Sequence, residues 1–333
     1  MKAYWIAAAF VLAFDAVAAA APKVQPASKD ATQPYPNRPL RIIVPFPAGG
    51  GVDITNRILT SRLPEVLGQQ VVIENRPGAA GNVGADISAK STPDGYTIFA
   101  CGVASHGVSP AIYKKLPFDA EKDFAPISML GTTPNVLVIH PAVPAKTVAE
   151  FIVHVKAGGG KIPYATPGVG TSPHMTMELF KLATGVTMVH VPYKGGAPAL
   201  QDVMGGHVVG MFGNLGEQIA AIKSGRTRAL AVSSVKRHPQ LPDVPTVAES
   251  GIPGFEVTAW YASCVPSGVP KAILDTLNAA VVKTLSFPDI REKYVQTAIE
   301  PAASTREELA AFIKSEIAKW RKVAQSAGIS LDY

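Results

Sequence analysis

The feature that most constrains the fold is a strand pattern that runs into a glycine-rich turn and then into an amphipathic helix. Residues 41–44 (RIIV) predict the strand, and residues 45–53 (PFPAGGGVD) predict the turn. Apolar residues at three- and four-residue spacing predict one helix that ends at Gly68: Ile54, Ile58, Leu59, Leu63, Val66 and Leu67. Because a helix N-terminus presents free N–H groups and partial positive charge, the turn favours a carboxylate or a phosphate.

A second copy of this arrangement follows roughly 120 residues later, by alignment of the two patterns. Residues 161–166 predict a strand, residues 167–172 a glycine-rich turn, and the next helix has Ser172 as its expected N-cap. Each copy is followed by another short strand and another glycine-rich turn, at 71–81 and 188–197. The repeat predicts two similar α/β lobes, each a mainly parallel sheet flanked by helices, with a ligand cleft between them.

The N-terminal segment has the features of an export signal. An apolar stretch at 3–14 is followed by alanines that offer a cleavage site near Ala20 or Ala21. A membrane anchor is the alternative, but Asp15 interrupts a stretch that is too short to span a bilayer. We therefore expect an exported mature protein that begins with a flexible lead-in.

Two later strands predict where the chain crosses between the lobes. Residues 136–139 indicate the first crossing and residues 255–265 the return, so the C-terminal helices are expected to join the first lobe. The last of these helices is expected to begin at Thr305, with Glu308 completing a capping box. The expected organisation is a signal peptide at 1–21, a lead-in at 22–36, one lobe at 37–140 with 256–333, and the other lobe at 141–255.

Composition and motifs exclude several classes of function. The chain has 31 Lys and Arg against 25 Asp and Glu, a net charge of +6, without a dense basic tract interleaved with aromatic residues, so nucleic-acid binding is not supported. Its glycine-rich turns match neither a nucleotide-binding P-loop nor the G-x-G-x-x-G pattern. Clustered metal-ligand spacings are absent as well, and we expect no metal and no cofactor.

The two cysteines, Cys101 and Cys264, each lie inside an apolar run. We expect two buried free thiols, which is the usual state of such residues. A single disulfide is the alternative, because an exported protein meets an oxidising compartment.

The candidate ligand-binding residues lie on the predicted turns. Asp53 either caps its own helix or faces the cleft, where it favours an amino or hydroxyl group on the ligand. Ser172 with His174 permits a serine hydrolase as the rival function, but the chain has no G-x-S-x-G elbow and Ser172 has a capping role. The full candidate set is Phe46, Pro47, Ala48, Gly49, Gly50, Gly51, Val52, Asp53, Ser105, Gly168, Gly170, Thr171, Ser172, His174 and Asn214.

The motifs together resemble one known family. The segments PFPAGGGVD, ENRPGAAGNVGAD, STPDGYTI, YKKLPFD, GVGTSPH, VPYKGGAPALQD and VPSGVPK occur in the order seen in the substrate-binding receptors of tripartite tricarboxylate transporters, also called Bug or TctC receptors. The resemblance covers nearly the whole chain from about Tyr35 onward. It departs at Gly213, where the family often has Asp.

The resemblance implies a two-lobe periplasmic-binding-protein fold of the Venus-flytrap type. It also implies a non-catalytic, periplasmic receptor, expected to be a monomer, that holds a di- or tricarboxylate, an amino acid or an aromatic acid and delivers it to membrane permease subunits. By position, the family's ligand loops correspond to Phe46–Asp53 and Gly168–His174, with Ser105 on a third loop. A ligand-sensing subunit of a signalling system is a further alternative.

Overall fold

The computed structural model describes residues 34–332, and the elements below belong to one unit, Pro36–Tyr333. The expected signal peptide at 1–21 and nearly all of the expected lead-in at 22–36 therefore lie outside the described residues. No helix within residues 34–332 combines the length and the apolar character that crossing a bilayer requires.

The main sheet is mixed, with strands in the order β10-β4-β9-β3-β1-β2. Strand β1 (Leu40–Val44) pairs in parallel with β2 (Val71–Asn75) and β3 (Thr97–Gly102). Strand β9 (Thr258–Pro266) pairs antiparallel with β3, and β10 (Glu300–Pro301) pairs antiparallel with β4. The predicted two-lobe α/β fold is confirmed, but the sheet is not mainly parallel, because the strands that connect the lobes run antiparallel to their neighbours.

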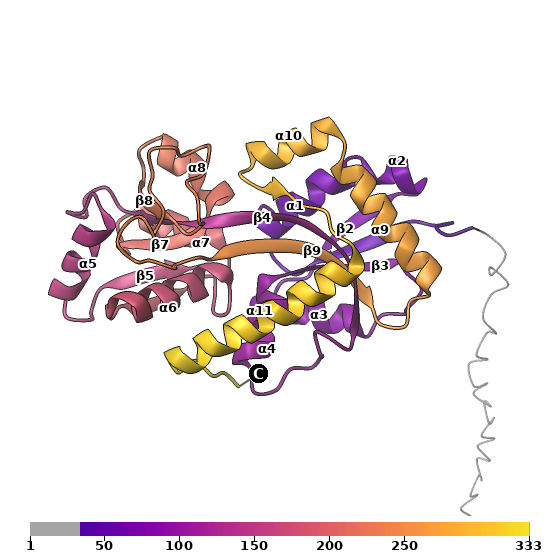
Figure 1. Cartoon of the computed structure of the whole chain (residues 1–333), viewed down its shortest axis with the longest axis horizontal. Helices are drawn as coiled ribbons and strands as arrows, with labels where there is room; N and C mark the ends of the chain where they lie inside the picture. Colours follow the sequence, from indigo (N-terminus) through magenta and orange to yellow (C-terminus); the bar gives the residue numbers. More distant parts are fainter. Residues whose placement is uncertain (1–33, 333) are drawn as a thin grey trace, which may run out of the picture. The chain divides into compact units, whose positions relative to one another are not determined.

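The long strand β4 (Phe124–Ile139) belongs to both halves of the fold. Its residues 124–134 pair with β9, whereas residues 135–139 pair with β7 (Gly210–Asn214) and β8 (Arg228–Val232). Figure 1 shows β4 and β9 running side by side between the two halves. The second half is completed by the parallel pair of β5 (Pro163–Thr166) and β6 (Val189–Pro192).

The predicted crossing at 136–139 is only the end of this 16-residue strand. Two irregularities in the β4–β9 register, near Pro126 and Gly131, interrupt the alternation by which a strand is found in a sequence. The predicted return strand at 255–265 begins three residues later, at Thr258.

Helices pack on both halves of the fold. Their bounds are α1 (Gly51–Thr60), α2 (Leu63–Leu67), α3 (Asn82–Ala89), α4 (Ser109–Ile112), α5 (Val148–Ala157), α6 (Ser172–Thr184), α7 (Gly196–Met204), α8 (Leu215–Lys223), α9 (Lys271–Leu285), α10 (Pro288–Gln296) and α11 (Arg306–Ala327). Two short turns, η2 (Ala79–Gly81) and the π-helical η3 (Val103–Val108), precede α3 and α4.

Three local predictions need correction. The single helix expected to end at Gly68 is two helices, α1 and α2: Arg62 leaves helical geometry at φ −131°, and Pro64 in the first turn of α2 has no N–H to continue the bonding of α1. The N-cap of α6 is Thr171 rather than Ser172, which is already helical. The segment after β3, expected as a loop, is the helical turn η3.

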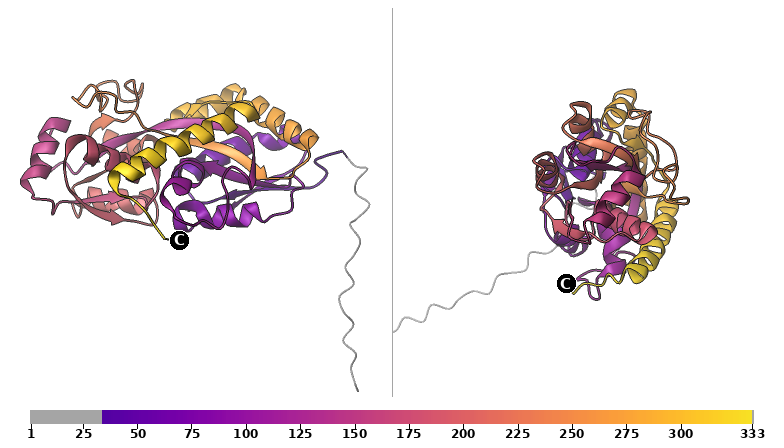
Figure 2. Two further views of the ribbon diagram at one scale, coloured as in Figure 1. Left: turned by 60° about the horizontal axis from the view of Figure 1, so that its bottom comes forward. Right: turned by 90° about the vertical axis from the view of Figure 1, so that its left-hand side faces the viewer.

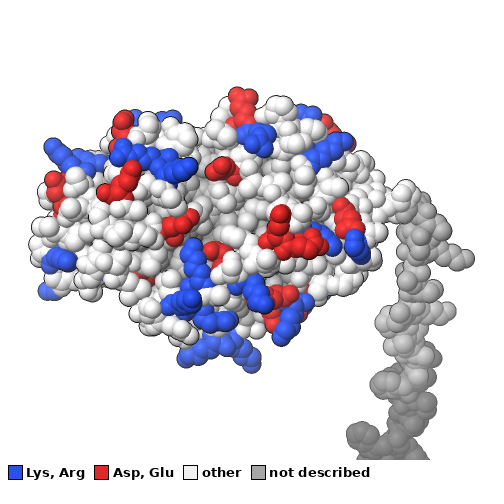
Figure 3. Space-filling view, in the orientation of Figure 1, with Lys and Arg blue, Asp and Glu red and all other residues white. Residues whose placement is uncertain are grey.

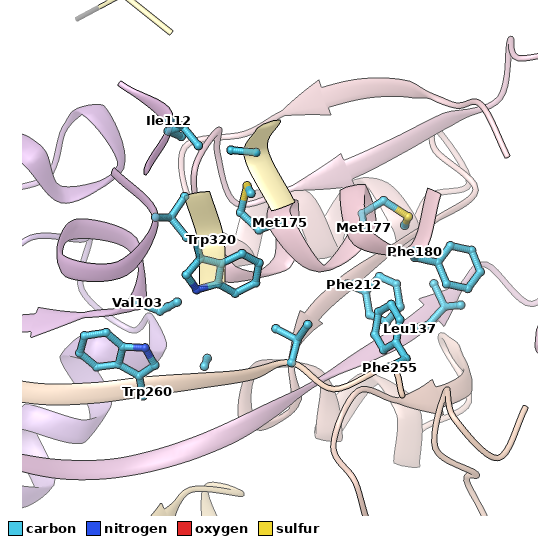
Figure 4. Packing of buried hydrophobic residues seen from close by; sticks show 14 of the residues in the cluster. Val103, Ile112, Leu137, Met175, Met177, Phe180, Phe212, Phe255, Trp260 and Trp320 are labelled. Carbon is cyan, nitrogen blue, oxygen red and sulfur yellow. The ribbon is translucent and has the colours of Figure 1, made fainter. Parts of the chain in front are cut away.

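The last helix, α11, packs against η3, α4 and β4, and it also contacts α6 of the other half (Figure 2). Its predicted capping box is confirmed: Thr305 Oγ1 accepts from the Glu308 N–H at 3.1 Å, and Glu308 Oε2 accepts from the Thr305 N–H at 2.9 Å. On the buried face of α11, Trp320 lies near Trp260 of β9 (Figure 4). Glu316 Oε2 accepts from both indole N–H groups at 3.0 Å, so these two buried donors share one carboxylate.

Cys101 and Cys264 form a disulfide, so the expectation of two free thiols was wrong. Cys101 of β3 pairs in register with Ala262 of β9, which places Cys264 diagonally across the same antiparallel pair with a Cα–Cα distance of 6.0 Å. That spacing is the usual one for a disulfide. The sequence did not reveal it because 163 positions separate the two residues.

Candidate functional site

A cavity of about 390 Å³ is lined by residues from both halves of the fold. One wall is the loop before α1, with η3 and the beginning of β9. The opposite wall contains the N-terminal ends of α6, α7 and α8. Of the candidate residues, those that line this cavity are Phe46, Pro47, Ala48, Gly49, Gly50, Gly51, Val52, Ser105, Thr171, Ser172 and Asn214.

The loop before α1 differs from the predicted cradle in one respect: its glycine N–H groups already have acceptors. The Gly49 N–H donates to Asp53 Oδ2 at 2.9 Å, the Gly50 N–H to Pro47 O at 3.4 Å, and the Gly51 N–H to Glu217 Oε1 at 2.9 Å. Gly49 has φ +84°, a left-handed conformation that glycine adopts without strain. Two carboxylates of the protein therefore already satisfy the positive end of α1.

Asp53 does not line the cavity. It is buried, and besides Gly49 it accepts hydrogen bonds from Arg57 Nε at 2.7 Å and from Asn75 Nδ2 at 2.9 Å. Burial opposes its ionisation, but the hydrogen bonds from Arg57, Gly49 and Asn75 outweigh burial and hold the pKa of Asp53 below its usual value. Asp53 therefore takes neither expected role: the N-cap of α1 is Gly50, without a side-chain cap, and Asp53 in the first turn connects the loop to α1 and β2.

In the second ligand loop, Thr171 and Ser172 line the cavity, whereas Gly168, Gly170 and His174 do not. His174 lies behind the loop, where its Nδ1 accepts from the Gly170 N–H at 3.2 Å and its ring stacks on His190 with centroids 4.4 Å apart. Burial, then the neighbouring His190, lowers the pKa of His174 to about 4. His174 therefore stabilises the loop in its neutral form.

The proposed nucleophile of the rival hydrolase is engaged elsewhere. Ser172 Oγ accepts from Asn135 Nδ2 at 2.7 Å, and the same amide donates to Thr176 Oγ1. Within residues 34–332 no hydrogen bond joins Ser172 to His174, so the pair does not form the nucleophile and base that acyl transfer requires.

Ser105 reaches the cavity from the turn η3. Its Oγ lies 3.1 Å from Nδ1 of His106, which is fully buried beside Phe124. Burial lowers the pKa of His106 to about 3, so this imidazole stays neutral at ordinary pH. The Cys101–Cys264 disulfide lies next to this turn and joins the two strands beneath it.

Three charged residues that line the cavity were not among the candidates from the sequence: Lys194, Glu217 and Arg226. Lys194 lies in the predicted glycine-rich segment 188–197, so its position in the repeat could have indicated that it lies near the ligand loops. Glu217 occupies the first turn of α8, three residues after the candidate Asn214, whose Nδ2 lies 3.4 Å from Glu217 Oε1. Trp260 and Tyr261 of β9 also line the cavity, although both are almost fully buried.

Basic and acidic side chains are interspersed over most of the surface shown in Figure 3. The chain also forms exposed ion pairs, such as Arg38–Asp94, Arg237–Glu249 and Lys271–Asp275. Such pairs contribute little to stability.

Residues 55–329 match the model of the tripartite tricarboxylate transporter family receptor. A "UPF0065 protein in tcbD-tcbE intergenic region" of Pseudomonas sp. (strain P51) is 38% identical over 292 residues, which are 87% of this chain and 86% of that protein.

Two solved structures have the same fold. "R. palustris Rpa4515 with adipate" has a TM-score of 0.86 and 34% identity, over 90% of this chain and 100% of that one. The "periplasmic binding protein BugD" has a TM-score of 0.85 and 34% identity, with the same coverage. With the match to the family model over most of its length, this chain belongs to the receptor family of the tripartite tricarboxylate transporters.

Proposed function

We propose that this protein captures a small carboxylate in the cavity between its lobes and delivers it to a membrane permease. The observation that carries the proposal is the cavity itself, since both lobes contribute to one mostly apolar space with basic side chains at its edge. Lys194 and Arg226 are exposed and can attract an anion before it enters. The bound adipate of the R. palustris relative supports a carboxylate as the ligand.

The contact residues of the proposed site come from four segments. They are Phe46 to Val52 at the start of α1, Ser105 on η3, Thr171 and Ser172 at the start of α6, and Asn214 at the start of α8. Each of the first three segments is positioned by a buried network behind it, through Asp53, His106 and His174 in turn. The cavity is therefore preformed, which lowers the ordering cost of binding.

The lobe boundaries follow from β4 and β9. We place residues 37–140 and 256–333 in one lobe and residues 141–255 in the other, with the two crossing strands as the connection. Two contacts support a closed arrangement: the Gly51 N–H bonds Glu217, and Gly170 packs beside Ile112 and Ala80. Two connecting strands allow one lobe to bend relative to the other and limit rotation between the lobes. Bending that separates the lobes at this connection would open the cavity and admit the ligand.

Location and partners follow from the family and from the N-terminal sequence. The relative BugD is a periplasmic binding protein, and the sequence at 1–21 has the pattern of an export signal. We place the mature protein in the periplasm as a monomer without catalytic turnover. A signalling partner in place of the permease is the second candidate, and only a cellular test separates the two.

Thermal unfolding of the mature protein against di- and tricarboxylates, amino acids and aromatic acids tests binding. A ligand at about 100 times its Kd adds about 2.7 kcal/mol, which raises Tm by about 5 °C for a protein of this size. A rise with one acid class supports the receptor. No rise with any acid, in protein freed of bound solute by unfolding and refolding, contradicts it.

Uptake of that acid by cells with and without the gene then tests delivery. Unchanged uptake with a lost transcriptional response to the acid would favour the signalling subunit.

A further inference from the structure

The carboxylate of Glu217 lies where two helices from opposite lobes begin. Its Oε1 accepts from the Gly51 N–H at 2.9 Å, at the start of α1. Its Oε2 lies against Gly196, at the start of α7, so closely that a Cβ at Gly196 would overlap the carboxylate. A Cβ at Gly51 would overlap the hydroxyl of Tyr261. Glycine at 196 thus makes room for the carboxylate of Glu217, and glycine at 51 makes room for the hydroxyl of Tyr261 beside it.

One oxygen of this carboxylate has no protein partner. Oε2 is buried, and no donor among residues 34–332 bonds it, nor does any basic side chain there form an ion pair with Glu217. Burial raises the pKa of Glu217 even though Gly51 and Asn214 donate hydrogen bonds that oppose the rise. Burying an acceptor without a donor is unfavourable, so a donor brought in by a ligand would gain free energy at this atom.

The other two charged residues that line the cavity, Lys194 and Arg226, are basic and lie apart from Glu217. Lys194 and Arg226 are exposed, whereas Glu217 is half-buried and its Oε2 atom is buried. Neither basic side chain forms an ion pair with any residue that the structure describes. Much of the remaining lining is apolar, as at Phe46, Leu200 and Met204. One cavity therefore offers a carboxyl group with a buried, unpartnered oxygen, separate cations and an apolar surface.

We infer that the ligand carries a protonated amine that pairs with Glu217, and that the solute is therefore an amino acid rather than a simple mono- or dicarboxylate. The inference rests on the proposed function, because it assigns the chemistry of the same cavity. The ligand carboxylate is left for Lys194, Arg226 and the N–H groups at the start of α7. Glu217, and not the Asp53 considered from the sequence, is then the acidic residue that determines specificity.

Matched pairs of acids that differ only in the amine provide the test: leucine against 4-methylpentanoate, phenylalanine against 3-phenylpropionate, and glutamate against glutarate. Calorimetric titration at pH 7.4 measures each Kd for the wild type, for Glu217→Gln and for Glu121→Gln. Gln at 217 retains an oxygen that can accept from Gly51 and removes the negative charge. Glu121 is exposed and lies outside the cavity, so its variant controls for the loss of one charge.

For the pair that binds, the wild type and Glu121→Gln should prefer the amino acid by about 10- to 100-fold, the range expected for a hydrogen bond to a charged group. Glu217→Gln should bring that ratio close to one. Equal or tighter binding of the amine-free acids to the wild type overturns the inference and leaves the receptor function intact. An amine preference that survives in Glu217→Gln also overturns it. Binding of neither class contradicts the proposed function itself. If Glu217→Gln does not fold, the ratio of the two Kd values measured for the wild type decides between these outcomes.

Discussion

Reduction of the Cys101–Cys264 disulfide should destabilise this protein strongly. The bond closes a loop of 163 residues and joins β3 to β9, the strands beneath the cavity. The chain-entropy relation for a loop of this length gives about 5 kcal/mol at 25 °C. Native disulfides deliver about 2–5 kcal/mol in practice, so we expect a loss of about 3–5 kcal/mol.

Urea unfolding of the oxidised and the reduced protein, followed by far-UV circular dichroism, measures this difference. With a urea slope near 3 kcal/mol/M, which suits a chain of this size, the midpoint should fall by about 1–2 M. Reduction is the preferred perturbation because both sulfur atoms stay in the core. The double variant Cys101→Ala, Cys264→Ala should lose more, since both side chains are fully buried.

Thiol titration must show two free thiols in the reduced sample. If such a sample unfolds at the midpoint of the oxidised protein, the loop-closure reasoning is refuted. The same result in the double variant, which cannot reoxidise, would exclude reformation of the bond as the explanation.

Three further predictions concern the cavity and its supports. Gly50→Leu should weaken ligand binding about 10- to 100-fold in calorimetry, because its side chain would occupy the cavity that Gly50 lines. Its Tm should not change, because Gly50 has a φ of −78° and a Cβ there would meet only Pro47 O, at 3.5 Å. Glu316→Leu should lower the free energy of unfolding in urea by about 2–4 kcal/mol, because two buried indole donors lose their acceptor. In His174→Phe, the free energy of unfolding should fall less between pH 6.5 and pH 4 than it does in the wild type, as measured by urea unfolding across that range. With a pKa of about 4 when folded and about 6.5 when unfolded, His174 binds more protons in the unfolded state there, so its contribution falls with pH by up to about 3 kcal/mol.

Each of these has a matched control. Gly50→Ala should keep most of the affinity, and a bulky variant that binds normally would show that this loop does not touch the ligand. Glu316→Gln keeps one acceptor and should cost less than Glu316→Leu; equal costs would mean that packing rather than hydrogen bonding is lost. A His174→Phe variant with the pH dependence of the wild type would assign the acid sensitivity to His106 or Glu178 instead.

Of the candidate site, the sequence identified the loops better than it identified the side chains. Residues 46–52, 171 and 172 line the cavity as expected, because glycine-rich turns after strands are local features. Asp53 and His174 lie in the same loops but point to partners behind them. Which way a side chain points depends on the strands and helices that pack behind the loop, and no local pattern encodes that.

The sequence by itself determined the repeat, the α/β class, the capping of α11 by Thr305, and the family, because each depends on residues close together in the chain. The tertiary structure alone decided which distant residues meet. The Cys101–Cys264 bond, the Gly51–Glu217 hydrogen bond across 166 positions, and the shared acceptor of Trp260 and Trp320 all depend on how β4, β9 and α11 connect the lobes. Hydrogen bonds and disulfides form between neighbours in space, and closing the long loops that bring them together requires the burial of the whole core.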